Sequence, residues 1–331
     1  MTHVAFGGPD LPPRHLRDLL QQQVDAAPAG SRIDWATYYF RDRGLAEALM
    51  RASDRGAQVN LALEARPRRR DANHRVAAML AHHGLGGGFR LRRGGMGSLH
   101  AKIYAFSEPR IAWMGSFNPS GDDPEDADVV AEIGDQDRGH NLLVGLTDPV
   151  LVDALAAHTV RLGRTRSVTD RLRPAFNRTI RSKESALFFY PRLRTRMAER
   201  DVNALGPGDQ LLGAVSHLKS GSLSAALVAA GRRGADVRLL VHDTERRVPS
   251  ELVRELQARG VSVQRVGGAD GLPMHAKFLL VRRAGRIAAW TGSFNFNPRS
   301  RWLNDELLLR TEDPGVTAAL ERRFAEIARS A

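Results

Sequence analysis

The chain has 331 residues, a formal net charge of +12 at pH 7 and no cysteine. This length allows one large domain or two medium ones, and the lack of cysteine excludes disulfides, thiol catalysis and iron–sulfur clusters. No apolar run is long enough to cross a membrane, and residues 1–14 lack the apolar segment of a secretory signal, so we expect a cytoplasmic location. The basic charge favours anionic partners, and the alternative is an arginine-rich, solvated surface without a special role.

The first half of the chain alternates predicted helices and strands. Residues 1–30 indicate a loose lead-in that contains one short helix. Leu45, Ala48 and Leu49 have the spacing of an apolar helix face. We expect helices over residues 15–26, 44–53, 72–82 and 149–162, and strands over residues 33–40, 58–64, 89–92, 101–106, 110–116 and 141–146.

The second half shows the same alternation after a stretch rich in Arg, Thr and Ser over residues 161–181. That stretch has little apolar periodicity, so we expect a linker that runs over the surface. Ordered structure resumes at Ser185–Pro191. We then expect strands over residues 210–217, 235–242, 261–266, 286–293 and 305–310, a strand at His275, and helices over residues 222–231, 250–259 and 315–330.

One sequence motif occurs twice. His-Ala-Lys stands at residues 100–102 and again at residues 275–277. Each copy is followed by an apolar run, a turn and Gly-Ser-Phe-Asn, at residues 115–118 and 292–295. A single His-x-Lys has little meaning, but two copies that are each followed by the same pattern of residues indicate an internal repeat.

The repeat extends beyond this motif and predicts the fold. Residues 55–59 (Arg-Gly-Ala-Gln-Val) match residues 233–237 (Arg-Gly-Ala-Asp-Val). Strands that alternate with helices in both halves predict an α/β fold, with two α/β sandwich lobes that each contain a mixed sheet. We assign residues 1–165 to an N-terminal lobe, residues 166–184 to a basic linker and residues 185–331 to a C-terminal lobe.

The repeated motifs supply an imidazole, an ammonium, a carboxamide and a hydroxyl in each lobe. Histidine can act as a nucleophile or as a proton carrier near neutral pH. Because side chains alternate along a strand, we expect the His and Lys of each motif to share one face, as do the Ser and Asn. Two lobes related by a pseudo-twofold axis would bring both sets to one point. The expected catalytic residues are His100, Lys102, Asn118, His275, Lys277 and Asn295, with Ser116 and Ser293 in support.

Such a set of side chains suits the cleavage of a phosphodiester. Two ammonium groups and two carboxamides can hold the non-bridging oxygens as charge builds up in the transition state. One histidine would attack phosphorus, while the other would protonate the leaving oxygen and later deprotonate the incoming water or alcohol. Because the lysines neutralise the phosphate charge, we expect no metal and no cofactor. No cluster of residues has the spacing of a zinc site.

At these residues the sequence resembles the phospholipase D superfamily, whose signature is His-x-Lys, four residues, Asp, six residues and Gly-Ser-x-Asn. The second copy, over residues 292–300 and 303–306, is similar to the C-terminal half of bacterial cardiolipin synthases. Residues 187–191 resemble the start of the second lobe in secreted actinobacterial members. The resemblance implies an intramolecular pseudo-dimer with one active site at the lobe interface. It also implies a covalent phosphohistidine and metal-independent transfer to water or an alcohol.

The sequence departs from the family signature at its aspartates. Ser107 and Arg282 stand where the signature has Asp, and Glu108 is a candidate substitute in the first copy. Family members also use a downstream acid to orient a histidine, and Glu306 fits this role, whereas the first half has His140 and Asn141 near the matching strand and no carboxylate. This asymmetry indicates different roles for the two histidines. By analogy with the family, we expect His100 to be the nucleophile and His275 the acid and base.

Polar residues at the ends of the two equivalent first strands form a candidate substrate-binding rim. Tyr38 and Tyr39 end the strand of the first lobe, and Ser216 and His217 end that of the second. Strand ends of this kind border the site in open α/β sheets. Arg66, with the three further arginines that follow it, can grip a phosphate tail. The alternatives are ordinary packing for the strand ends and a solvated loop for the arginines.

These observations favour a phosphodiesterase or phosphatidyltransferase that acts on a phospholipid or another small phosphodiester. The alternatives are a nuclease, which the basic charge favours, a non-catalytic nucleic-acid or phosphate-binding relative, and an enzyme acting on a phosphorylated metabolic intermediate. The sequence shows no basic stripe interleaved with aromatic residues for a single strand, nor an exposed apolar element for a lipid. We expect peripheral membrane or nucleic-acid contact through the basic surface and no obligate protein partner.

Overall fold

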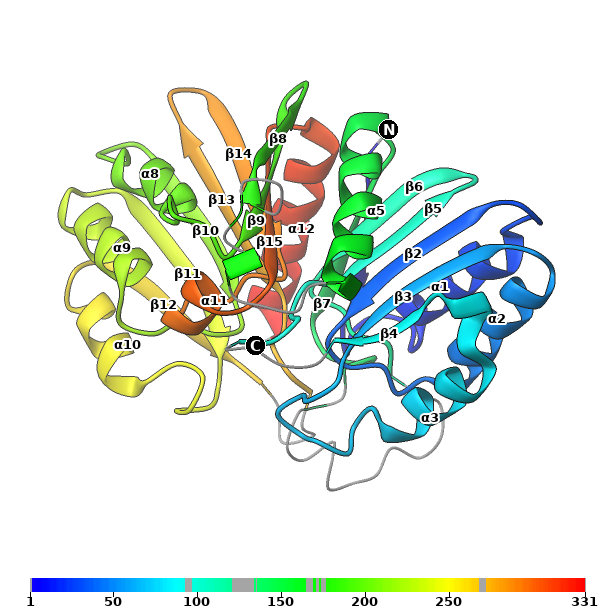
Figure 1. The fold of residues 1–331 in the computed structure, drawn as a ribbon. Helices are drawn as coiled ribbons and strands as arrows, with labels where there is room; N and C mark the ends of the chain where they lie inside the picture. Colours follow the sequence, from blue (N-terminus) through cyan, green and yellow to red (C-terminus); the bar gives the residue numbers. More distant parts are fainter. Residues whose placement is uncertain are drawn as a thin grey trace.

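The computed structural model describes residues 2–92, 97–120, 134, 136–164, 169–170, 173, 177–267 and 272–330. Within this part of the chain the strands form two mixed sheets, one of 7 and one of 8 strands. Figure 1 shows the two sheets facing each other, with helices on the outside of both and two helices between them. The predicted two-lobe α/β architecture is therefore confirmed.

The first sheet has the strand order β1-β7-β6-β5-β2-β3-β4. β2, β3 and β4 are parallel to one another, and the remaining neighbours are antiparallel. The strands are β1 (His3–Gly7), β2 (Arg32–Thr37), β3 (Gln58–Glu64), β4 (Phe89–Arg92), β5 (Ile103–Ser107), β6 (Arg110–Gly115) and β7 (Asn141–Leu146). The helices are α1 (His15–Ala26), α2 (Arg43–Asp54), α3 (His74–His83), the 3-10 turn η1 (Gly84–Gly87) and α5 (Pro149–Arg164).

The second sheet has the order β12-β11-β10-β13-β14-β15-β9-β8. Its strands β10 to β15 repeat the arrangement of β2 to β7 in the first lobe. The strands are β8 (Thr179–Ser182), β9 (Ser185–Tyr190), β10 (Gln210–Val215), β11 (Asp236–His242), β12 (Val261–Val266), β13 (Lys277–Arg283), β14 (Arg286–Gly292) and β15 (Glu306–Thr311). The helices are α8 (Met197–Asn203), α9 (Ser222–Arg232), α10 (Ser250–Gln257), α11 (Pro298–Trp302) and α12 (Pro314–Ser330).

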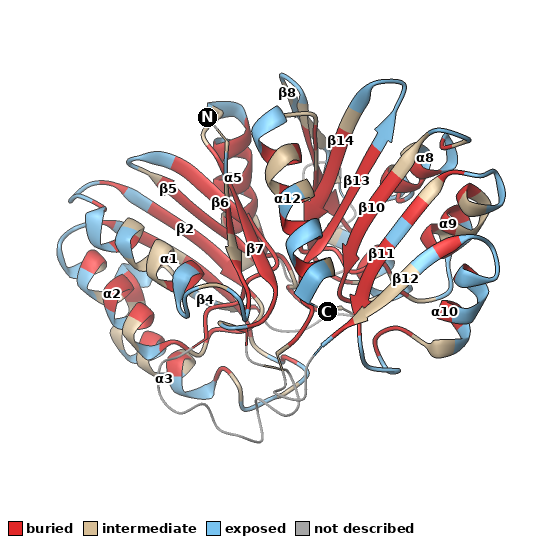
Figure 2. Cartoon of the chain, turned by 180° about the vertical axis from the view of Figure 1, so that it is seen from behind, coloured by how far each residue is buried: buried red, intermediate tan, exposed pale blue. Residues whose placement is uncertain are grey.

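The two lobes share one hydrophobic core. The inner faces of both sheets contribute to one apolar cluster, together with α5 and α12, which lie between the sheets (Figure 1). Leu155 of α5 and Leu320 of α12 are fully buried in this cluster. Figure 2 shows buried residues along the strands and along the inward sides of the helices, with exposed residues on the outer sides. The packing fixes the position of one lobe against the other.

Backbone pairing between the lobes occurs at both His-Ala-Lys motifs. Leu99 bridges Asp305 of the second lobe, and Met274 bridges His140 of the first. His100 N donates to Asp305 O at 2.9 Å, and His275 N donates to His140 O at 3.0 Å. Each motif is thus held against the residue that precedes β15 or β7 of the opposite lobe. These two bridges fix the position of each motif against the opposite lobe.

Three segments differ from the sequence-based expectations. The expected loose lead-in contains β1, which pairs with β7 at the edge of the sheet, because backbone pairing there needs no long alternating pattern. Within the expected linker, Thr179–Ser182 forms β8, a short edge strand against β9. The sequence also did not indicate α8. Residues 165–168, 171–172 and 174–176 of the linker region lie outside the described residues.

Candidate active site

The two His-Ala-Lys motifs lie at the start of equivalent strands. His100 and Lys102 precede β5, and Lys277 is the first residue of β13, so the motifs stand before the strands and not within them as expected. Lys102 Nζ donates to His100 O at 2.6 Å, and Lys277 Nζ donates to His275 O at 2.6 Å. Both ammonium groups are therefore turned back onto the backbone of their own histidine.

Each histidine is oriented by a residue of the opposite lobe. His100 Nδ1 lies 2.9 Å from Glu306 Oε2, and His275 Nδ1 lies 2.9 Å from Asn141 Oδ1. Glu306 begins β15 and Asn141 begins β7, so the two partners occupy equivalent places in the repeat. The sequence indicated that Glu306 orients a histidine, and the structure places it on the histidine of the other lobe. The contacts cross the interface in both directions.

The serines of the two Gly-Ser-Phe-Asn motifs support these partners. Ser293 Oγ donates to Glu306 Oε2 at 2.5 Å, and Ser116 Oγ donates to Asn141 Oδ1 at 3.0 Å. Ser300 of α11 adds a second hydrogen bond of 2.6 Å to Glu306 Oε1. The carboxylate is fixed by a histidine and two hydroxyls, which leaves it little freedom to turn.

The two motif asparagines line the same pocket as the histidines. Asn118 Oδ1 accepts from Tyr39 N at 3.2 Å, and its Nδ2 donates to Gln136 Oε1 at 3.3 Å. Asn295 is buried, and within the described part of the chain its Oδ1 has no hydrogen-bond partner. A polar atom that is buried without a partner is costly, so this carboxamide is suited to bind a ligand in the pocket.

Burial of the two lysines shapes the electrostatics of the pocket. Burial lowers the pKa of Lys102 to about 7. Burial and the nearby Lys102 charge hold the pKa of Lys277 well below its ordinary value. With two buried ammonium groups and one carboxylate, that of Glu306, the net charge beside the pocket is positive. An anion bound there would restore the balance and raise both pKa values.

The two histidines differ in their charged surroundings. Burial lowers the pKa of His100, although the Glu306 carboxylate opposes this shift. Burial, followed by the charges of Lys277 and Lys102, holds the pKa of His275 well below its ordinary value, and Asn141 offers no charge to oppose it. Burial alone would raise the pKa of Glu306, but the His100 contact lowers it overall. His100 is therefore paired with a charged group, Glu306, whereas His275 is paired with the neutral Asn141.

A pocket of about 510 Å³ is lined by His100 and His275 and by the two motif asparagines. Tyr38 packs on the His100 ring at a centroid distance of 5.1 Å, and Lys102 Nζ lies 5.6 Å from the centre of the Tyr38 ring. Tyr39 and His217 also line the pocket, and His217 Nδ1 lies 3.0 Å from Ser216 Oγ. The structure thus brings Tyr38, Tyr39, His217 and Arg66 to the same cavity as the histidines and asparagines of both motifs, whereas Lys102 and Lys277 are not among its lining residues.

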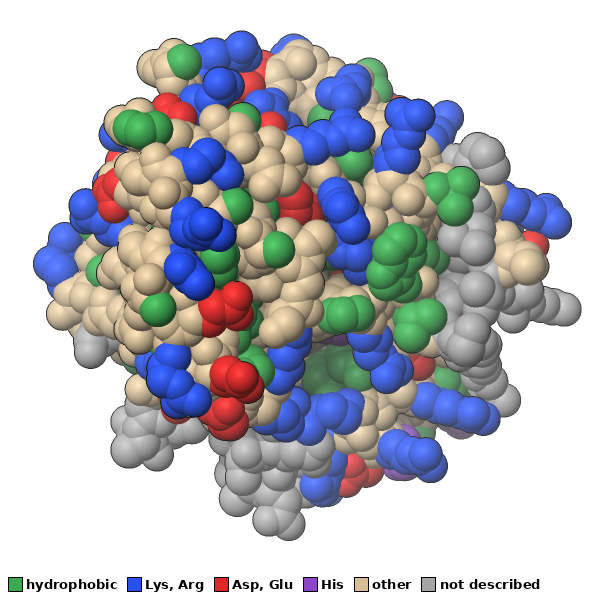
Figure 3. Space-filling view, turned by 90° about the vertical axis from the view of Figure 1, so that its left-hand side faces the viewer, with side chains coloured by type: hydrophobic (Ala, Val, Ile, Leu, Met, Phe, Trp, Pro, Cys, Tyr) green, Lys and Arg blue, Asp and Glu red, His purple; other side chains and the backbone are tan. Residues whose placement is uncertain are grey.

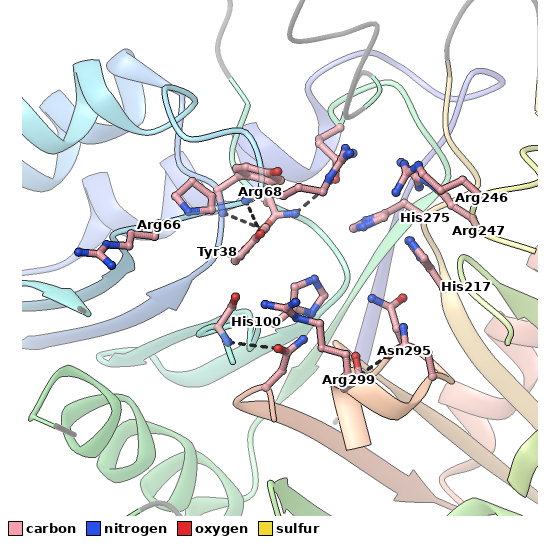
Figure 4. Close-up of a pocket in the computed structure, with 18 of the residues that line it drawn as sticks. Tyr38, Arg66, Arg68, His100, His217, Arg246, Arg247, His275, Asn295 and Arg299 are labelled. Atoms are coloured by element: carbon pink, nitrogen blue, oxygen red, sulfur yellow. Dashed lines mark hydrogen bonds between the residues drawn. The ribbon is translucent and has the colours of Figure 1, made fainter. Parts of the chain in front are cut away.

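Arginines surround the pocket from both lobes (Figure 4). Arg68 and Arg246 occupy equivalent loops, after β3 and β11 respectively. No Asp or Glu lines the pocket in the described part of the chain. The lining arginines are Arg66, Arg68, Arg70, Arg246, Arg247 and Arg299. Figure 3 shows a hollow on one face of the molecule that is bordered by Lys and Arg side chains. The cavity is therefore suited to an anion.

Sequence reasoning missed several of the residues that line this site. Arg246 follows from the repeat, because the displacement that relates Arg55 to Arg233 also relates Arg68 to Arg246. Ser300 and Gln136 could not be found in this way. Their positions depend on how α11 and the segment before β7 turn toward the pocket, and no local pattern indicates that.

The residues at the signature aspartate positions lie away from the pocket. Ser107 ends β5, where its Oγ accepts from Arg32 N at 2.7 Å. Glu108 is exposed in the β5–β6 turn and does not reach the site, so the structure does not support it as a substitute. Arg282 donates to Glu321 of α12 at 2.7 Å. Each turn stands at the end of β5 or β13 that is remote from its His-Ala-Lys motif, which is why the turns do not contact the histidines.

The described residues contain neither a metal-binding cluster nor a membrane span. No group of three or more His, Asp or Glu side chains there could hold a metal ion. No helix there combines the length and the apolar character that a membrane crossing requires.

Comparison with known proteins gives one family and several similar folds. The profile of the family described as "cardiolipin synthase, PLD-like domain" matches residues 21–123 and 207–328. The structure of phosphatidylserine synthase from Haemophilus influenzae is 13% identical, with a TM-score of 0.69, and the match covers 98% of this chain and 86% of that one. Polyphosphate kinase from Porphyromonas gingivalis is 16% identical, with a TM-score of 0.67. That match covers 99% of this chain but 47% of the kinase, so the chain spans about half of its length. No curated protein sequence matches the chain significantly.

Proposed function

The chain belongs to the phospholipase D superfamily, and we propose that it cleaves a phosphodiester by transferring the phosphoryl group to a histidine of one active site shared by both lobes. The observation that carries this proposal is the crossed pairing of His100 with Glu306 and of His275 with Asn141. This pairing accompanies the placement of both histidines in one pocket lined by arginines, with the lysine of each motif bonded to the backbone of its histidine. The family and the fold support the proposal.

In the first step His100 is the nucleophile. Its Nδ1–H is donated to Glu306, which leaves the Nε2 lone pair directed at the pocket. Nε2 forms a bond to phosphorus as the ester P–O bond breaks, and the leaving oxygen takes a proton from Nε2 of protonated His275. The Glu306 carboxylate stabilises the positive charge that the imidazole ring of His100 gains. The product is a phosphohistidine with one alcohol released.

In the second step the roles of proton donor and acceptor are reversed. His275, now neutral, takes a proton from water or an alcohol, whose oxygen attacks phosphorus as the P–N bond to His100 breaks. Lys102, Lys277, Asn118 and Asn295 face the phosphoryl oxygens throughout, where fixed charges and dipoles stabilise the transition state. Hydrolysis and transfer differ only in the acceptor.

The leading substrate is a phospholipid or another small phosphodiester. The similarity of the second motif to lipid synthases supports it, and the pocket is large enough for a phosphodiester head group. The second candidate is a nuclease, which the arginines around the pocket favour because guanidinium groups bind phosphate oxygens well. A binding-only relative would have no need of two complete, mutually oriented His-Lys pairs.

The test is hydrolysis of bis(p-nitrophenyl) phosphate in EDTA by the wild type, His100→Ala and His275→Ala. Loss of the nucleophile His100 or of the proton-transfer residue His275 is expected to lower the rate by at least about 100-fold. His82→Ala is the matched control, because His82 is exposed and does not line the pocket. Full activity in either pocket variant would contradict the shared site.

A further inference from the structure

The pocket can take the head group of a phospholipid but offers no place for its acyl chains. Among its described lining residues, Pro67 is the one aliphatic side chain, and the others are polar, charged or tyrosine. If a phospholipid is the substrate, as proposed above, its acyl chains must remain outside. The surface beside the pocket mouth then decides how the enzyme meets the bilayer.

Two exposed large apolar side chains lie on α11, which lines the pocket, and on the loop bonded to α11. In the described residues three large hydrophobic side chains are exposed, namely Val150, Leu193 and Trp302. Leu193, in the loop between β9 and α8, is 82% exposed, and Trp302, at the end of α11, is 53% exposed. Arg299 and Ser300 of the same short helix line the pocket. Trp302 is therefore less than one helical turn from the pocket wall.

The loop of Leu193 and the helix of Trp302 are joined by Arg301. Its Nη1 donates to Thr195 O at 2.7 Å, and its Nη2 forms an ion pair with Glu199 of α8. The guanidinium also lies 5.7 Å from the centre of the Phe294 ring. Arg301 is buried by these contacts. Leu193 and Trp302 are thus displayed by neighbouring segments that are fixed to the body of the second lobe.

The same segments carry exposed positive charge. Arg194, Arg196 and Arg299 are exposed, and within the described part of the chain their guanidinium groups have no hydrogen bond or ion pair. The one acid of this region named above, Glu199, is already paired with Arg301. Figure 3 shows Lys and Arg side chains spread over one face of the molecule, with small hydrophobic areas among them.

We propose that this enzyme docks on an anionic lipid bilayer and thereby presents the pocket mouth to the lipid head groups. The apolar anchors are Leu193 and Trp302. The flanking positive charges are Arg194, Arg196 and Arg299. Tryptophan prefers the interface between head groups and acyl chains, and arginines near an anionic surface are attracted to it. A nucleic acid fits less well, because aliphatic Leu193, the more exposed of the two, offers no ring on which a base can stack.

Vesicle binding by the full chain tests this proposal with an internal reporter. Of the four tryptophans, Trp35, Trp113 and Trp290 are 0%, 5% and 2% exposed, so Trp302 alone can change its environment on docking. We expect a blue shift of fluorescence and co-sedimentation with vesicles of phosphatidylcholine and phosphatidylglycerol. With phosphatidylcholine alone, or at high salt, binding is expected to weaken, since screening reduces the attraction.

The double variant Leu193→Ser/Trp302→Ser is expected to lose about tenfold or more in vesicle affinity, since both apolar anchors are removed. Val150→Ser is the matched control, because Val150 is exposed to the same extent as Trp302 but belongs to α5 and not to the segments of the proposed docking surface. Hydrolysis of soluble bis(p-nitrophenyl) phosphate by the double variant should equal that of the wild type. This readout separates a folding defect from a docking defect.

Equal vesicle affinity of the double variant and the wild type would overturn the proposal. So would binding of single-stranded DNA, but not of vesicles, through the same two residues. Vesicle binding that depends on them in a protein without phosphodiester turnover would support the docking surface and contradict the proposed function instead. The two failures are thereby distinguishable.

Discussion

Glu306 and Asn141 occupy equivalent positions but differ in charge, and this difference gives the two histidines different electrostatic surroundings. Glu306 holds His100 with a carboxylate, whereas Asn141 holds His275 with a neutral carboxamide. A carboxylate stabilises a positively charged ring, as in a phosphorylated imidazole. The two residues thus explain, at the level of single atoms, why a nearly symmetric site can act asymmetrically.

Replacement of Asn141 by Asp tests the role of His275. Its pKa lies well below the ordinary value because of burial and the charges of Lys277 and Lys102. If protonated His275 donates the proton, kcat/KM must fall as pH rises through that pKa. A new carboxylate favours the protonated ring, so in Asn141→Asp this fall should move to higher pH by about one to two units. A pH profile of kcat/KM with a small diester measures it.

The control for this profile is Asn203→Asp, which adds the same charge at an exposed position outside the pocket. Its profile should match that of the wild type. A high-pH limb that stays in place in Asn141→Asp would show that another group supplies the proton.

Lys102 is predicted to lower the stability of the folded protein while serving catalysis. Its pKa is about 7 in the folded state against 10.5 for an ordinary lysine, so between these pH values the unfolded chain binds more protons. The free energy of unfolding therefore falls as pH drops from about 10 toward 7. Lys102→Met should raise the melting temperature at pH 7 and abolish diester hydrolysis.

Lys219→Met is the control for this substitution, because Lys219 is partly exposed and lies outside the pocket. It should leave both melting temperature and activity near the wild-type values. A lower melting temperature for Lys102→Met would mean that the buried ammonium stabilises the fold.

At the scale of elements, the decisive contacts are those of each His-Ala-Lys segment with the opposite lobe. Asp305 N donates to Ser98 O at 2.8 Å, and the buried ion pair of Arg92 with Asp305, at 2.9 Å, fixes the same junction. Gly97 stands where this segment passes the second lobe, with a φ of +88°. A Cβ on Gly97 would lie 1.9 Å from Leu303 O, which leaves no space for a side chain.

Gly97→Ala should therefore displace the His100 segment and lower the activity. Gly86→Ala is its matched control, because Gly86 also has a positive φ, of +59°, but a Cβ there would have nothing within 4 Å. Both variants carry the strain of about 1–2 kcal/mol for an L-residue in this region, whereas only Gly97→Ala adds the clash. Urea unfolding and diester hydrolysis of the two variants measure the difference. Equal activity would show that the junction does not position His100.

The sequence predicted most elements because their apolar patterns are local. The strands β3, β4, β7 and β12 begin and end where expected, as does α1. β1 and β8 were missed because they are short edge strands, and their place depends on the partners β7 and β9. The motif residues were found by their repetition. Glu306 was expected to orient a histidine, but its contact with the histidine of the opposite lobe was not expected, because it depends on the packing of one lobe on the other.

At the scale of the whole molecule, α5 of the first lobe packs against β9 of the second through a buried histidine. The ring of His158 stacks on Phe189 at a centroid distance of 4.1 Å, and in the described structure its two nitrogens have no hydrogen-bond partner. Burial lowers the pKa of His158 to about 3. The contact between the lobes thus requires a neutral ring.

Acid should accordingly weaken the fold at this contact. Below pH 6.5 the unfolded chain takes up a proton at His158, but the folded protein does not until about pH 3. His158 alone should lower the free energy of unfolding by about 2 kcal/mol between pH 7 and pH 5. In His158→Phe this loss should be smaller by that amount, as measured by urea unfolding at both pH values. An unchanged pH dependence would show that the pKa of His158 is not lowered in the folded protein.

The central claim is that both lobes form one site in which His100 carries the phosphoryl group. The most direct measurement is to mix the protein with excess bis(p-nitrophenyl) phosphate, quench in base to preserve the phosphoramidate bond, and map the added mass on peptides. We predict an adduct on the peptide of His100, which is absent from His100→Ala. It should persist longer in His275→Ala, if enough forms, because that variant lacks the base for the second step. Turnover with an adduct on His275, or with none, would contradict the account.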